Sequence, residues 1–167
     1  MPETVFGLPL HPLVVHGAVV LVPLAALLTI VVAASPDKRA RLGWVTWGMA
    51  SIALIATFVA EVSGQSLQRE LYPDVVPQSV SDHQQLGTNA IWFALALWLA
   101  VTALLLIDFD RRRRTDFGSP VLPTVLAVLA IMVAMAATAQ ILLTGWSGTK
   151  SQWQLTRAEG ESSRSTT

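Results

Sequence analysis

The chain has 167 residues, enough for one domain, and 53% of them are hydrophobic while only 13% are charged; soluble domains carry about a quarter charged residues. The formal net charge is zero, so the overall charge indicates no polyanionic partner such as nucleic acid. Cysteine is absent, which excludes disulfides, thiolate metal sites, iron–sulfur ligation and covalent c-type haem attachment.

Four apolar runs are long enough to cross a bilayer, which takes about 20 residues. They cover residues 13–34, 42–62, 86–107 and 121–143, and Glu61 is the one full charge within them. Core helices of soluble proteins keep a polar face, and these runs show none. The sequence therefore predicts an all-α integral membrane protein: an up-down four-helix bundle over residues 1–155, followed by a disordered polar tail over 156–167.

The basic residues indicate how the bundle is oriented. Seven of the 11 Lys and Arg residues lie in two connections, 35–41 and 108–114. The positive-inside rule places both connections in the cytoplasm, so that both termini and the middle connection are extracytoplasmic. We interpret the run Arg111–Arg114 as a topology determinant rather than a nucleic-acid patch, because Asp108 and Asp110 precede it and Asp116 follows.

The middle connection, residues 63–81, predicts a short helix over 65–72 that lies on the outer membrane surface. Ser81 and Gln84 have the spacing of a capping box, which predicts that the third helix starts at residues 82–84. No long internal repeat is evident. The first two spans and the last two each enclose a basic connection.

Polar residues of all four spans are expected at one depth, near the outer face. His11 and His16 stand at the start of the first span, Glu61 at the end of the second, and Asp82 and His83 at the start of the third. Gly145, Trp146, Ser147, Gly148 and Lys150 follow the fourth. Ionisable residues within membrane segments are costly and usually functional.

One interpretation of these residues is a haem site. Imidazoles on two helices ligate haem in membrane cytochromes, and His16 and His83 suit that arrangement. His83 shares a helix face with Gly87, Ala90 and Ala94, whose small side chains leave room for a flat group. Lys150 or Arg69 would then pair with the haem propionates.

Two other interpretations stay open. His11, His16 and His83 offer three nitrogens, and Glu61 or Asp82 a carboxylate, to a Zn, Cu or Fe ion; we take His11 as non-helical because it precedes Pro12, so that its side chain is free to fold back. Alternatively, the polar residues form a hydrogen-bonded cap without a ligand. No nucleophile with its base, phosphate loop or metalloprotease helix is present, which favours a carrier or accessory subunit over an enzyme.

The segment Gly7-Leu8-Pro9-Leu10-His11-Pro12-Leu13-Val14-Val15-His16 resembles the opening of the small bacterial membrane proteins classed as domain of unknown function 2231. The resemblance continues at Asp82-His83, at Asn89 and at Thr144-Gly145-Trp146-Ser147-Gly148. It departs at Gly17-Ala18, where family members usually have Phe-Pro. The resemblance implies four spans, a bacterial cytoplasmic membrane and, because some relatives are joined to Rieske-type domains, respiratory electron transfer.

These observations together predict a protein in the lipid bilayer that carries haem b and passes electrons to or from a protein partner or quinone. The alternatives are an accessory subunit of a larger respiratory complex and a site for a bare transition metal.

Overall fold

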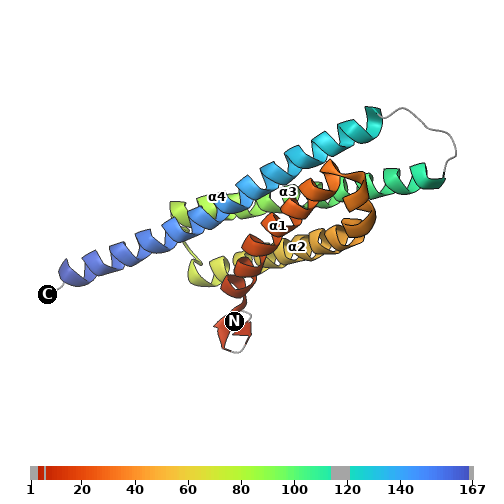
Figure 1. Cartoon of the computed structure of the whole chain (residues 1–167). Coiled ribbons are helices and arrows are strands. Elements are labelled where there is room, and N and C mark those ends of the chain that lie inside the picture. The colour runs from red at the N-terminus through yellow and green to blue at the C-terminus, as the bar shows by residue number, and fades with distance from the viewer. Residues whose placement is uncertain (1–3, 6, 114–120, 166–167) are drawn as a thin grey trace.

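A computed structural model describes residues 4–5, 7–113 and 121–165 of the chain. The described residues form four helices: α1 (Leu10–Ala34), α2 (Pro36–Leu71), α3 (Gln78–Arg113) and α4 (Val121–Ser165). They run alternately up and down and pack as a bundle, from which α4 projects toward the C-terminus (Figure 1). All four are long and apolar enough to cross a membrane, so the predicted four-span bundle is confirmed.

Two short strands precede the bundle. β1 (Thr4–Val5) and β2 (Leu8–Pro9) pair antiparallel. Gly7 stands in the turn between them with φ +78°, a left-handed conformation that a residue without Cβ adopts at little cost. This hairpin leads directly into the first turn of α1.

The helices extend further than the apolar runs. α2 continues to Leu71 as one helix, so the separate surface helix predicted over 65–72 is wrong. α3 begins at Gln78, and the expected capping box of Ser81 and Gln84 lies inside it. α4 continues to Ser165 through the tail for which the sequence predicted disorder. Within that extension the Arg157 guanidinium lies over the Trp153 ring, 5.2 Å from its centre, a contact between neighbours one helical turn apart.

The core consists of small side chains. Stripes of small residues at helical spacing are buried: Ala53, Thr57 and Ala60 on α2, Ala90 and Ala94 on α3, and Ala130, Ala134 and Ala137 on α4. Leu97, Val101 and Leu104 of α3 fill the spaces between them. Many large apolar side chains point outward instead, among them Val20, Phe58, Trp92 and Leu106. A surface of this kind suits contact with lipid, where close backbone approach holds helices together.

The connection between α1 and α2 is a single residue, Ser35, whose hydroxyl accepts a hydrogen bond from the Lys38 amide. Arg39 completes this turn. Its guanidinium donates to the carbonyls of Val32 and Ala33, at 2.9 and 3.0 Å, and its side chain is only 6% exposed. These carbonyls lie in the last turn of α1, where no intrahelical donor is available. A basic side chain at this end is further stabilised by the helix dipole.

We expect Arg39→Ala to lower the free energy of unfolding by about 2–4 kcal/mol, because two hydrogen bonds from a charged donor are lost. Denaturant unfolding in mixed micelles, followed by tryptophan fluorescence, measures this change. The control is Arg41→Ala, since Arg41 is exposed on the same turn; it should cost less than about 0.5 kcal/mol. Equal losses in the two variants would contradict the structural role of Arg39.

Candidate functional site: two facing histidines at one end of the bundle

His11 and His83 face each other across the end of the bundle at which α1 and α3 begin. His11 lies in the first turn of α1 and His83 in the second turn of α3. Their ring centroids are 6.5 Å apart and the ring planes are inclined at 73°. The structure therefore brings together two imidazoles from distant parts of the chain.

His11 is held by α2. Its Nδ1 lies 2.8 Å from the Ala60 carbonyl and 3.4 Å from the Ser63 hydroxyl. The Ser63 hydroxyl itself donates to the Ala60 carbonyl at 3.0 Å. Because a carbonyl only accepts, the short contact requires the proton of His11 to be on Nδ1.

His83 is held in the same way by α4. Its Nδ1 lies 2.9 Å from the Ser147 hydroxyl, and the imidazole also interacts with the backbone of Thr144. The Ser147 hydroxyl donates its own proton to the Thr144 carbonyl at 2.8 Å. It must therefore accept from His83, which again places the imidazole proton on Nδ1.

In the neutral form of either imidazole, Nε2 is then the nitrogen without a proton. Among the residues that the structure describes, neither Nε2 has a hydrogen-bond partner, although every fully buried polar side-chain atom there has one. Neither Nε2 is therefore fully buried. A neutral imidazole whose other nitrogen is anchored is the form that ligates metals.

Three glycines allow these side chains to fit between the helices. A Cβ at Gly64 would lie 2.8 Å from His11 Cε1, and one at Gly148 would lie 3.0 Å from His83 Cε1. A Cβ at Gly87 would lie 2.9 Å from Glu61 Oε2. Each polar side chain therefore packs directly against the backbone of a neighbouring helix.

Glu61 belongs to the same end of the bundle. Its Oε1 accepts hydrogen bonds from Thr88 at 2.5 Å and from Gln65 at 3.0 Å. Arg69 reaches Gln65 one turn further out, at 3.4 Å. The negative charge of Glu61 is near enough to act on His83, so the histidine pair has an anionic neighbour on one side.

The other predicted site residues lie elsewhere. His16 is exposed, and its Nδ1 contacts the Pro12 carbonyl of its own helix at 2.6 Å. Asp82 is exposed and accepts from Gln78, and Lys150 is exposed. Five residues turn a helix by about 140°, so His11 and His16 cannot both face α3. His11 is helical, contrary to our expectation, and it is the one that does.

The space expected beneath His83 is filled. Ala90 and Ala94 are packed in the core, and the Glu61 carboxylate lies against Gly87. Within the described ranges, no three His, Asp or Glu side chains are placed to hold one metal ion. What the geometry offers is a pair of neighbouring imidazoles near one end of the bundle.

The role of the Ser-Gly dipeptides was missed from the sequence. Ser63-Gly64 on α2 and Ser147-Gly148 on α4 each supply a hydroxyl to one imidazole and a bare backbone beside its ring. The signal was the recurrence of Ser-Gly at the same end of α2 and α4, each of which runs antiparallel to a helix that carries a histidine. It went unused because nothing linked either dipeptide to a particular histidine.

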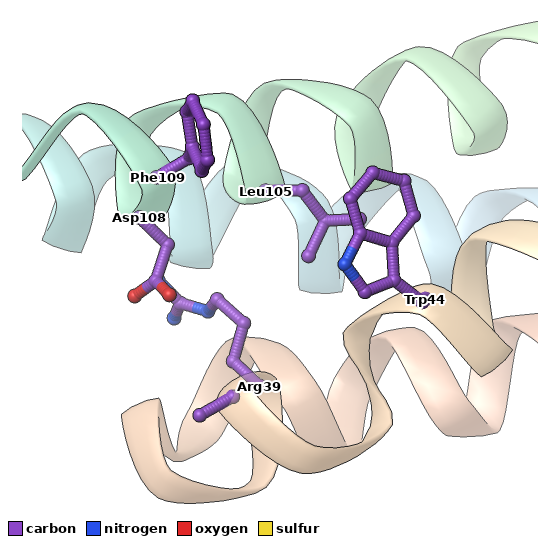
Figure 2. Close-up of a pocket in the computed structure, with 6 residues that line it drawn as sticks. Arg39, Trp44, Leu105, Asp108 and Phe109 are labelled. Atoms are coloured by element: carbon purple, nitrogen blue, oxygen red, sulfur yellow. The ribbon is translucent and has the colours of Figure 1, made fainter. Parts of the chain in front are cut away.

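A pocket of about 210 Å³ lies at the opposite end, lined by Arg39, Ala40, Trp44, Leu105, Asp108 and Phe109. Figure 2 shows the Asp108 carboxylate facing the Arg39 guanidinium across it. Arg39 already caps α1 and interacts with the charge of Asp108. The charged groups of this pocket therefore serve the packing of α1, α2 and α3.

Comparison with known proteins agrees with this architecture. No curated protein and no solved structure matches the chain. Residues 7–157 match the model of one family, and this range contains both histidines and both Ser-Gly dipeptides. The chain, an integral membrane protein, belongs to the family described as "Predicted membrane protein (DUF2231)".

Proposed function

We propose that this protein is a membrane electron carrier that binds haem b between His11 and His83. The observation that carries the proposal is the facing pair of imidazoles, each anchored through Nδ1 with Nε2 left free. Two metal–imidazole bonds of about 2 Å each, together with the half-widths of the rings, give a centroid separation of about 6 Å. The 6.5 Å separation in the structure is close to this value.

The number of ligands favours haem over a bare ion. A porphyrin supplies four nitrogens and needs two more from the protein, whereas a bare Zn, Cu or Fe ion usually takes three or more protein ligands. The part of the chain that the structure describes supplies two imidazoles and no third group placed with them. The pair therefore suits the two axial positions of haem iron.

The surrounding residues would set the properties of the site. The Ala60 carbonyl and the Ser147 hydroxyl hold the imidazoles in the tautomer that leaves Nε2 as a ligand. Glu61 places a negative charge beside the pair, which favours the more positive oxidation state of a bound metal. A porphyrin would enter from the histidine end, because Ala90 and Ala94 close the interior. Bound haem would supply one-electron transfer.

Such a carrier needs a donor and an acceptor, for which we propose a redox protein, a quinone or a larger respiratory complex. We place the protein in the bacterial cytoplasmic membrane, with the histidine end and both termini on the extracytoplasmic side. The basic residues at the opposite end support this orientation.

Purified from haem-replete cells in detergent, the protein is expected to show a Soret band and about one iron per chain. His11→Ala and His83→Ala should each lower haem occupancy at least about tenfold, because haem iron then loses an axial ligand. His16→Ala is the matched control and should leave the spectrum unchanged, since this ring contacts only its own helix.

Absorbance and metal analysis, with circular dichroism to verify folding, measure these outcomes. A colourless protein would contradict the proposal, as would a stoichiometric metal without a Soret band. Loss of the spectrum in His16→Ala but not in His11→Ala would contradict the pair and favour His16 with His83.

The orientation is tested with single cysteines, because the chain has none of its own. We expect Asp74→Cys, in the connection between α2 and α3, to react with a membrane-impermeant maleimide on intact cells. Asp37→Cys, at the start of α2, should react only after the membrane is opened. Both native side chains are exposed. The reverse pattern would place the histidine end in the cytoplasm.

A further inference from the structure

The two halves of the chain hold their histidines with the same set of groups. In the first half, a serine on α2 bonds to the imidazole and to the carbonyl three residues before it, and the next residue is the glycine under the ring. In the second half, a serine and a glycine on α4 make the same contacts with His83. The arrangement thus contains four matched parts: histidine, serine, carbonyl and glycine.

The buried positions of the helices repeat in the same register. We aligned the halves by matching His11 with His83 and Ser63 with Ser147. Nine buried positions of the first half then coincide with buried positions of the second. The pairs are Ala18 with Ala90, Val22 with Ala94, Ala25 with Leu97, Thr29 with Val101, Val32 with Leu104, Thr46 with Ala130, Ala50 with Ala134, Ala53 with Ala137 and Thr57 with Ile141.

Agreement between the site and the packing makes a chance resemblance a poor explanation. The site register was set by two polar contacts at one end of the bundle, yet it reproduces the buried positions from Ala90 to Leu104 on α3 and from Ala130 to Ile141 on α4. Both histidines also stand at the same end, so the halves have the same direction across the membrane. This is the relation of parallel repeats, whose two-fold axis runs along the membrane normal.

We infer that this chain consists of two copies of one helical hairpin, and that His11 and His83 meet on the two-fold axis that relates them. Ser63-Gly64 and Ser147-Gly148 are then equivalent positioning residues, one pair for each imidazole. A ligand on the axis meets two identical nitrogen donors, as the two axial positions of a single metal centre require. The nature of that ligand rests on the proposed function, whereas the equivalence of the two halves does not.

Glu61 is the clearest departure from this symmetry. In the alignment it corresponds to Gly145 on α4, and its neighbour Gly87 corresponds to Val15 on α1. One side of the axis therefore carries a carboxylate that the other side lacks. The exchange shows how the two copies diverged while the imidazole-holding groups stayed the same.

The test compares matched substitutions in the full-length protein. Gly64→Ala and Gly148→Ala should each displace one imidazole, because the added methyl group meets His11 or His83 at 3.0 Å or less. Gly17→Ala and Gly48→Ala are the controls, since a Cβ at either position meets nothing within 4 Å. If an alanine variant fails to fold, Ser63→Ala and Ser147→Ala replace it, because they delete a single oxygen from each half.

Two measurements separate this inference from the proposed function. Proton–nitrogen spectra of ¹⁵N-histidine-labelled protein freed of haem should show His11 and His83 in one common tautomer, with Nε2 unprotonated. Gly64→Ala should perturb the signals of His11 and Gly148→Ala those of His83. Haem per chain should fall about tenfold in either variant, the usual effect of losing a group that orients a ligand.

Each result decides one claim. If the wild-type protein lacks haem but the two imidazoles share one tautomer and respond to their own glycines, the proposed function is wrong and the duplication stands. Different tautomers, or an effect confined to one half, would overturn the inference. Perturbation of either histidine by the Gly17 and Gly48 controls would also overturn it.

Discussion

Close approach of helix backbones is the constraint on which this structure depends. Lipid is as apolar as the side chains, so burial of apolar surface contributes little to the association of helices in a bilayer. Dispersion contacts must do this instead, and they require that adjacent helices come near one another. The Ala and Thr positions of α2 and α4 permit it, and large residues such as Leu97 and Leu104 fill the remaining spaces.

The same constraint shapes the polar end. A histidine ring occupies far more room than alanine, so it fits between two helices only where a neighbour has no side chain. Gly64 and Gly148 provide that room, and the serines beside them satisfy Nδ1. Polar groups in an apolar environment are costly unless they are bonded. The end of the bundle thus holds two imidazoles at a moderate cost in free energy while keeping one nitrogen of each available.

Much of the fold was predictable, because the apolar runs and the small-residue stripes are local patterns. In lipid, such patterns favour membrane-spanning helices that pack closely. The helix ends were less predictable: Leu71 and Ser165 lie beyond the apolar runs, where helix propensity rather than hydropathy decides. At the site, the sequence predicted that polar residues of different spans gather at one end, and the structure places His11, Glu61 and His83 there; the binding of a ligand by His83 stays a prediction. The choice between His11 and His16 did not follow from the sequence, because it depends on the rotation of α1 about its axis. That rotation is set by packing along the whole of α1, including Ala18 and Ala25, and not by residues near the histidines.

The length of α4 has a consequence for anything that approaches the histidine end. At 1.5 Å per residue, its 45 residues span about 67 Å, whereas the hydrocarbon layer is about 30 Å thick. Its C-terminal portion therefore stands clear of the lipid as a rod that extends past the histidine end of the bundle (Figure 1). A soluble macromolecule cannot lie flat across that surface. It has to approach from the side opposite the projecting part of α4 or bind to that part of α4 itself. Access of large molecules to the histidine end is consequently directional.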